Sequence, residues 1–231
     1  MADGNTTIQG RAVGEVVVWD LPIRAFHWCL VVLVTVAVVT AKLGRMEIHM
    51  LAGEAILVLL LFRLVWGVIG SQTARFSQFV RGPRAVFAYA ADLLRGRTGA
   101  PVLGHNPIGA LMVLALLAAL AVQAASGLFT SDDILVDGPL VPLAASSTVK
   151  TLSTLHRTLA DGILVLVGVH VLAVFAYLLV KKENLVRPMI TGRKAVPAAD
   201  LRAAPKRTPA AVALAVLAAA AGLVALAVRA V

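Results

Sequence analysis

The sequence predicts an all-α integral membrane protein, because of its composition and the grouping of its apolar residues. The chain has 231 residues, of which 60% are hydrophobic, and its mean hydropathy is +0.90. Soluble domains are less apolar than this. The apolar residues also form long blocks, each close to the roughly 20 residues that a helix needs to cross a bilayer. We therefore expect a transmembrane helical bundle.

Five apolar blocks are candidate spans. They cover residues 25–43, 48–69, 107–129, 155–178 and 209–228. The first four predict a four-helix transmembrane bundle. The fifth, almost entirely Ala, Leu and Val, is either an additional C-terminal transmembrane helix or a helix lying on or beside the bundle. Between the second and third spans, a proline-initiated stretch over residues 83–94 predicts a short interfacial helix.

The distribution of charge predicts the orientation and the organisation of the chain. The formal charge of +9 lies in the connections between apolar blocks, which indicates membrane topology and not nucleic-acid binding. Residues 71–106 and the segment after the fourth span are strongly basic, whereas residues 130–150 are acidic, so we expect a cytoplasmic N-terminus. The expected parts are a cytoplasmic tail at 1–21, a membrane domain at 22–182, a basic cytoplasmic segment at 183–208 and an extra transmembrane helix at 209–231.

Four histidines in the predicted spans sort into pairs by depth. His156 and His170 are fourteen residues apart, which places them on nearly the same helix face and about 21 Å apart along the axis. His27 begins the first span at the cytoplasmic side, and His49 begins the second span at the outer side. Because the fourth span runs inward, depth pairs His27 with His170 and His49 with His156.

Two pairs of imidazoles at two depths fit bis-histidine ligation of two stacked haem b groups in a four-helix bundle. One intramembrane histidine could instead form a hydrogen bond between helices, but four that divide evenly by depth favour ligation. A zinc site is disfavoured, because zinc prefers three or four clustered ligands and these histidines are divided between two depths. The single cysteine, Cys29, excludes a C-x-x-C-H haem attachment and a thiolate iron–sulfur site.

The second span repeats the fourteen-residue spacing, between His49 and Arg63. Arg63 is therefore expected near the cytoplasmic haem, where it could neutralise a propionate; the alternative is that it extends to the membrane surface. Gly53 and Gly67 lie close to the same face. Small residues at these positions would let a flat macrocycle approach the backbone.

Three further polar residues are candidates for the same sites. Arg24 and Arg157 lie close to ligand histidines and could also bind propionates. His105 precedes the third span in the sequence GHNP. It belongs either to an interfacial turn in which Asn106 caps the helix, or to a quinone or proton site near the inner haem.

Four segments resemble the bacterial cytochrome b561 family, which includes the hydrogenase-type cytochrome b subunits. They are VWDLPIRAFHW, EIHMLAGEAILVLLLFRLVWG, GHNPIGALM and LHRTLADGILVLVGVHVLAVF, and the resemblance covers about residues 17–180. It implies a di-haem membrane cytochrome that exchanges electrons with quinones, with His27, His49, His156 and His170 in the ligand positions. The C-terminal apolar block departs from the minimal four-helix pattern of the family.

We therefore expect a di-haem b-type cytochrome of a bacterial inner membrane, in contact with lipid and not with nucleic acid. It would move electrons between the quinone pool and a partner such as a soluble cytochrome, a hydrogenase subunit or a dehydrogenase subunit; a homo-oligomer is also compatible. The alternatives are a superoxide oxidase that reduces ubiquinone, a cytochrome b anchor subunit, and a non-redox transporter or structural bundle. Whether the chain is itself an enzyme stays open.

Overall fold

The structure is a computed structural model, and it describes residues 7–8, 11–97, 103–197 and 205–229. The remaining parts of the predicted N-terminal tail, of the long basic connections and of the C-terminus lie outside the described residues. The five predicted spans are helices long and apolar enough to cross a membrane. They are α1 (Leu21–Lys42), α2 (Met46–Ile69), α5 (Pro107–Gly127), α6 (Ser146–Leu179) and α8 (Ala210–Arg229).

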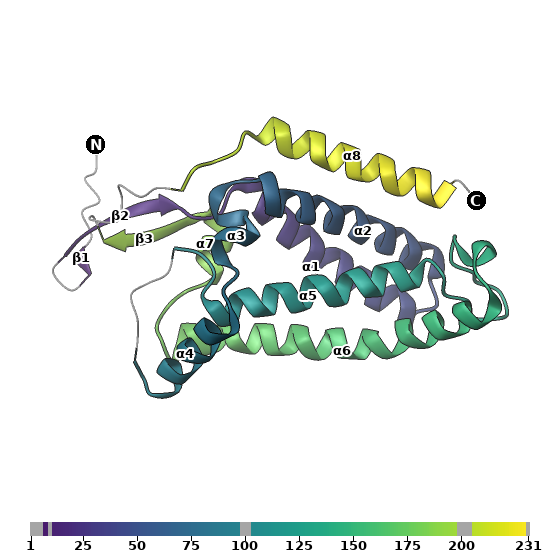
Figure 1. Cartoon of the computed structure of the whole chain (residues 1–231), viewed down its shortest axis with the longest axis horizontal. Coiled ribbons are helices and arrows are strands. Elements are labelled where there is room, and N and C mark those ends of the chain that lie inside the picture. Colours follow the sequence, from purple (N-terminus) through teal and green to yellow (C-terminus); the bar gives the residue numbers. More distant parts are fainter. Residues whose placement is uncertain (1–6, 9–10, 98–102, 198–204, 230–231) are drawn as a thin grey trace.

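The first four spans form the bundle, and α8 lies alongside α2 on its outside (Figure 1). This confirms the predicted helical membrane bundle with a fifth apolar helix. Helix α6 begins nine residues earlier than expected. Its 34 residues correspond to about 51 Å, longer than a hydrocarbon core of about 30 Å, so its first turns extend past the other helices.

Side-chain caps begin two of the spans. The Asp20 carboxylate accepts a hydrogen bond of 2.8 Å from the backbone N–H of Ile23, at the start of α1. The Asn106 side chain accepts one of 2.8 Å from the N–H of Gly109. Both satisfy amide groups that a helix N-terminus leaves unpaired. The predicted capping role of Asn106 is thus confirmed.

One end of the bundle, called here the sheet end, carries a small antiparallel sheet. Strand β2 (Arg11–Val17) pairs with β3 (Arg193–Pro197) in a register that opposes Val17 to Arg193, and β1 (Thr7–Ile8) pairs with β2. The sequence predicted a tail and a basic segment at these positions, without strands. Val16, Val18 and Val196 form the buried centre of the pairing. These valines are therefore buried only when the two segments pair.

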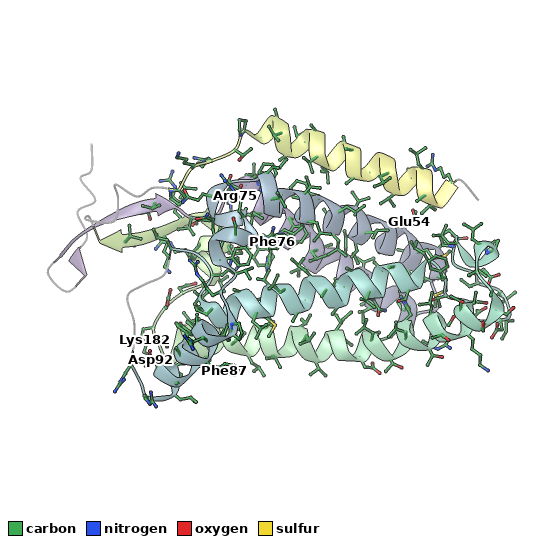
Figure 2. The ribbon with its side chains drawn as sticks, viewed as in Figure 1. Glu54, Arg75, Phe76, Phe87, Asp92 and Lys182 are labelled. Atoms are coloured by element: carbon green, nitrogen blue, oxygen red, sulfur yellow. The ribbon has the colours of Figure 1, made fainter. Side chains whose placement is uncertain are left out.

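The sheet end also holds the short helices. These are η1 (Gln72–Ala74), α3 (Phe76–Phe79), α4 (Pro83–Leu94) and α7 (Val186–Thr191). Helix α4 has the bounds predicted for the interfacial helix. Figure 2 shows Phe76 beside the end of α2 and Phe87 on α4, where 74% of the Phe87 surface is exposed. The opposite end, the acidic-loop end, is closed by residues 128–145 with η2 (Val141–Leu143).

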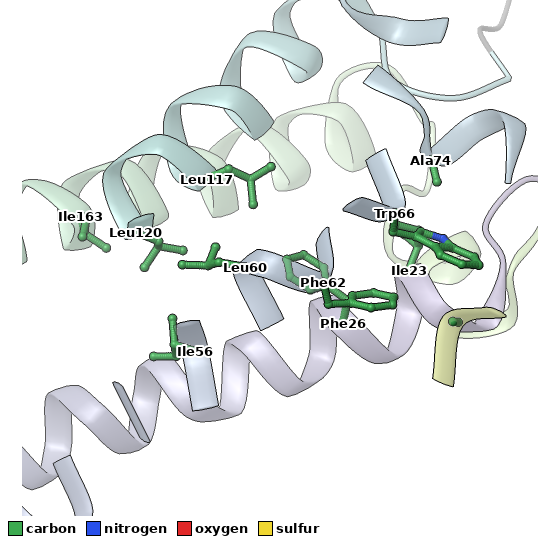
Figure 3. Close-up of a cluster of buried hydrophobic side chains, with 11 residues drawn as sticks. Ile23, Phe26, Ile56, Leu60, Phe62, Trp66, Ala74, Leu117, Leu120 and Ile163 are labelled. Carbon is green, nitrogen blue, oxygen red and sulfur yellow. The ribbon is translucent and has the colours of Figure 1, made fainter. Parts of the chain in front are cut away.

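The buried core lies between α1, α2 and α5 (Figure 3). Leu60 of α2 meets Leu117 and Leu120 of α5. Trp66 is fully buried, and its indole N–H donates to the Asp20 carboxylate at 3.1 Å. Asp20 therefore caps α1 and binds α2 at the same time, which fixes the sheet end of the bundle.

The segment before α8 is bound to the end of α2. The backbone N–H of Gln72 donates to the carbonyl of Lys206 at 2.9 Å, and the N–H of Thr208 donates to the Ser71 hydroxyl at 3.0 Å. Helix α8 then buries Ala213, Ala220 and Val224. Small residues spaced by seven occupy one helix face, so α8 packs closely along α2.

Candidate functional site

His49 and His156 face each other at the acidic-loop end. Their ring centroids are 6.1 Å apart with perpendicular planes. His49 Nδ1 lies 2.8 Å from the Ala37 carbonyl oxygen, and His156 Nδ1 lies 2.9 Å from the Gln123 carbonyl oxygen. A carbonyl oxygen can only accept, so each Nδ1 carries the proton and each Nε2 keeps a free lone pair. Metal-binding histidines have this arrangement.

The separation of these two rings fits a metal ion between them. A metal–imidazole nitrogen bond is about 2.0–2.1 Å long, and the ring centre lies about 1.1 Å beyond the nitrogen. Two such imidazoles on opposite sides of one ion would have centroids about 6.3 Å apart on this basis. The observed 6.1 Å agrees with that distance.

A cavity of about 480 Å³ surrounds this pair, within the range of small-molecule and cofactor sites. Its walls come from α1, α2, α5, α6 and the acidic loop. Gly53 lines it, and a Cβ at Gly53 would meet no atom within 4 Å, as expected for a position open to a macrocycle. A Cβ at Gly127 would instead lie 2.9 Å from His156, so this glycine leaves room for the imidazole.

Five charged residues line the cavity. They are Lys42, Glu54, Asp132, Arg157 and Asp161. The pKa of Asp132 is lowered by hydrogen bonds from the backbone N–H groups of Val136, Ile134 and Leu135. The Asp132 carboxylate therefore keeps its negative charge beside the cavity. Arg157, a predicted propionate partner, lines the cavity beside His156.

His27 and His170 both lie nearer the sheet end. His27 extends from the first turns of α1 and His170 from the second half of α6, and they are close enough to interact electrostatically. His27 Nδ1 is buried and has no hydrogen-bond partner among the described residues. Depth predicted two combinations, which are called below the acidic-loop pair (His49, His156) and the sheet-end pair (His27, His170).

Arg63 is buried near the sheet-end pair. Only 3% of its surface is exposed, so it does not extend to the membrane surface, which was the alternative prediction. Its guanidinium carbon lies 4.6 Å from the ring centre of Phe76, and one terminal nitrogen is buried without a hydrogen-bond partner in the described structure. The Asp20 carboxylate acts electrostatically on Arg63, but the unpaired N–H still favours a further hydrogen-bond acceptor. A carboxylate such as a haem propionate fits this requirement.

Two other predictions for this end had different outcomes. Arg24 donates from its guanidinium to the carbonyl of Ile190, which joins α1 to α7, and its Nε is buried without a partner among the described residues. The expectation that Gly67 is open to a macrocycle is wrong. A Cβ there would lie 2.0 Å from the Phe76 ring, so Phe76 already occupies this space.

His105 lies in an aromatic cluster at the sheet end. Its ring centre is 4.7 Å from that of Trp19 and 4.6 Å from that of Phe79. Burial lowers the pKa of His105 to about 4, and the charges of Arg63 and His170 act in the same direction. The imidazole is therefore neutral at pH 7. His105 is thus a buried group close to the sheet-end pair, next to the residue that caps α5.

Several residues that shape these sites could not be predicted from the sequence. Gln123 supplies the backbone carbonyl that orients His156, and because every residue has such a carbonyl, no residue type in α5 signals this role. The Asn106 amide donates to the Tyr177 hydroxyl, which is 2.9 Å from the Tyr89 hydroxyl. This network joins α4, α5 and α6, and no local pattern in the sequence announces it.

The donor set points to a macrocyclic metal cofactor. In the part of the chain that the structure describes, no group of three or more His, Cys, Asp or Glu side chains could hold a metal ion. Two imidazoles facing each other could bind a metal ion whose remaining ligands belong to a macrocycle. Such pairs inside a transmembrane bundle define the class of membrane haem proteins.

Comparison with known protein families identifies the member of that class. Residues 18–192 match the family of prokaryotic cytochrome b561, well over half of the chain, and the chain belongs to this family. It is a multi-pass bacterial membrane protein and a b-type cytochrome of electron transfer, and the cofactor of the family is haem b. No curated protein and no solved structure matched the chain. Helix α8 lies beyond the matched residues.

Proposed function

We propose that this chain binds two haem b groups and moves electrons between the quinone pool and a partner redox protein. The acidic-loop pair would hold one haem and the sheet-end pair the other. The observation that carries the proposal is the geometry of His49 and His156. Their centroid separation of 6.1 Å and their carbonyl-bound Nδ1 atoms leave both Nε2 atoms available to one iron.

Bound haem supplies a reversible one-electron change at its iron. The residues of the chain hold and orient that group. The carbonyls of Ala37 and Gln123 fix the ring orientation of His49 and His156, and they increase the basicity of Nε2. If His49 and His156 both bound the iron, no coordination position would remain for oxygen, which would favour electron transfer over oxygen chemistry.

The propionates would be neutralised at both ends of the bundle. Arg63, buried with an unpaired N–H, would bind a propionate of the sheet-end haem. Arg157, which lines the cavity, would do so for the acidic-loop haem. Arg24 is the weakest of the three candidates, because its terminal nitrogen already donates to Ile190. Such charge-assisted hydrogen bonds would also tune the two potentials.

The proposed orientation places the sheet end in the cytoplasm. The strongly basic segments, residues 71–97 and 181–194, belong to that end, whereas Asp132, Asp133 and Asp137 belong to the other. Basic connections stay on the cytoplasmic side. Reporter fusions after Arg97 and after Asp137 should therefore report opposite sides of the membrane, with Arg97 cytoplasmic; fusions on the same side would overturn this orientation.

Single-ligand variants test the two haem sites. His49→Met and His156→Met should lose the same spectral and redox component, and His27→Met and His170→Met should lose the other. Pyridine haemochrome analysis of the unmodified protein should give two extractable haems per chain. Loss of one common component in folded His27 and His49 variants would contradict the pairing. Haem-free protein would favour the non-redox alternative.

Quinol-driven reduction of the haems tests the electron donor, and adding back candidate partners tests the acceptor. Reoxidation by a soluble cytochrome would favour a diffusing partner, whereas a stable complex with a hydrogenase or dehydrogenase subunit would favour an anchor role. Superoxide oxidation is less supported, because the ionised Asp132 that lines the cavity repels an anion. Absence of reduction by any quinol would overturn the quinone role.

A further inference from the structure

Glu54 is a carboxylate inside a membrane-spanning helix. It lies eight residues into α2, about 12 Å along the helix axis, between apolar stretches. Among the ion pairs of the described residues, none includes Glu54. Figure 2 shows it on the half of α2 that begins at the acidic-loop end. An ionisable side chain in such a position is costly and usually has a function.

Glu54 borders two hollows at once. It lines the 480 Å³ cavity that contains His49 and His156. It also lines a more open pocket of about 380 Å³ that includes Glu47 and Asp137. The carboxylate therefore stands between the cavity of the acidic-loop pair and two protonatable groups at the aqueous end of the bundle.

The charges around Glu54 come from every neighbouring element. The cations near this end of the bundle are Lys42 of α1, Arg157 of α6 and Arg229 at the end of α8. The carboxylates are Glu47 of α2, Asp161 of α6, and Asp132 and Asp137 of the acidic loop. The two imidazoles are those of His49 and His156. The part of α5 that lines the cavity contributes the neutral Gln123. None of the cations forms an ion pair with Glu54 in the described structure.

We propose that Glu54 is a proton-exchange site coupled to the acidic-loop haem. If a haem held by His49 and His156 gained one electron, the Glu54 carboxylate would take up one proton from the acidic-loop side and become a carboxylic acid. When the electron left, the proton would return by the same side. The electron comes from the quinol or the reduced partner of the proposed function, on which this inference rests.

The physical reason is the low dielectric of the site. An added electron that is not compensated raises the electrostatic energy of a cavity inside the membrane far more than it would in water. Uptake of one proton by a carboxylate lining the same cavity restores the net charge. The neighbouring pocket with Glu47 and Asp137 provides protonatable groups on the outward side, so the proton need not cross the membrane.

Redox titration at several pH values tests the inference. In the holoprotein, the midpoint potential of the acidic-loop haem should fall as the pH rises, by up to about 59 mV per unit, the value for one proton per electron. Glu54→Gln should abolish this slope, whereas Glu54→Asp should retain it. The sheet-end haem should keep its own pH dependence in both variants.

Two matched variants and one direct measurement sharpen the result. Asp161→Asn removes another carboxylate of the same cavity, and Glu47→Gln removes one from the outer pocket only; both should keep the slope. Redox-induced infrared difference spectra of the unmodified protein should show a carboxylic acid that forms on reduction, with a band that shifts in Glu54→Asp. This measurement is available even if Glu54→Gln loses haem.

The outcomes separate this inference from the proposed function. A pH-independent acidic-loop haem, a slope retained in Glu54→Gln, or a slope lost in Asp161→Asn instead would each overturn the role of Glu54 while leaving the two haem sites intact. Absence of a haem component that depends on both His49 and His156 would overturn the proposed function itself.

Discussion

Gly127 occupies a position where any side chain would strike a proposed haem ligand. A Cβ at this position would lie 2.9 Å from His156 Cε1 and 3.2 Å from His156 Nδ1. Non-bonded carbon atoms prefer a separation of about 3.5–4.0 Å. Gly127→Ala must therefore displace the imidazole by about 0.6 Å or more. A movement of this size strains the 2.9 Å hydrogen bond from His156 to the Gln123 carbonyl.

The expected magnitude follows from these two contacts. Overpacking in a close-packed region costs about 1–3 kcal/mol, and a hydrogen bond contributes about 0.5–1.5 kcal/mol. Because the same displacement causes both effects, we expect a total of about 1–3 kcal/mol and not their full sum. If this cost falls on cofactor binding, the affinity of the acidic-loop site for haem drops about 5- to 150-fold.

The assay is the haem content and the redox titration of purified Gly127→Ala. We expect the component assigned to the acidic-loop pair to be depleted, while the component assigned to His27 and His170 remains. Gly162→Ala is the matched control, because its Cβ would be 3.9 Å from Leu159, an ordinary contact, in the helix that carries His156. A folded Gly127→Ala protein with full occupancy of both components would refute the reasoning.

Three other substitutions give different signatures. Gly53→Leu should deplete only the acidic-loop haem and leave the thermal stability of haem-free protein nearly unchanged, because a Cβ there meets no protein atom within 4 Å. Gly67→Ala should destabilise the whole bundle by about 1–3 kcal/mol and lower both haem components together, because the new methyl group strikes Phe76. The pKa of His105 is lowered to about 4 in the folded protein, whereas the unfolded chain binds the proton below about pH 6.5. The free energy of unfolding should therefore be highest above about pH 6.5 and should decrease as the pH falls toward 4. His105→Phe should flatten this part of the melting-temperature profile.

A different outcome would contradict each of these three predictions. An unchanged haem content in Gly53→Leu would mean that the macrocycle does not approach this part of α2. A wild-type melting temperature in Gly67→Ala would mean that Phe76 moves aside without cost. A His105→Phe variant that kept the full pH dependence between 6.5 and 4 would assign that dependence to other groups.

Local features of the sequence were enough to predict the bundle. The length and hydropathy of an apolar block determine whether a helix can cross the bilayer, so the five spans and the proline-initiated α4 could be recognised without knowledge of their neighbours. The depth of a residue in the membrane follows from its position within a span, and the charge of the connections predicts the direction in which each span crosses. These two features predict the pairing of His27 with His170 and of His49 with His156, and the structure shows the ring contact of the second pair. The capping role of Asn106 is local in the same way.

Only the tertiary structure decided how the surfaces of these elements meet. Gly53 and Gly67 look equivalent in the sequence, but one faces a cavity and the other is covered by Phe76. Strands β2 and β3 are separated by most of the chain, and neither has an apolar face wide enough to stand alone. The burial of Arg63 depends likewise on Phe76 reaching it from α3. The sequence of one helix shows which residues share a face of that helix. Which other residues pack against that face depends on segments that are distant in the chain.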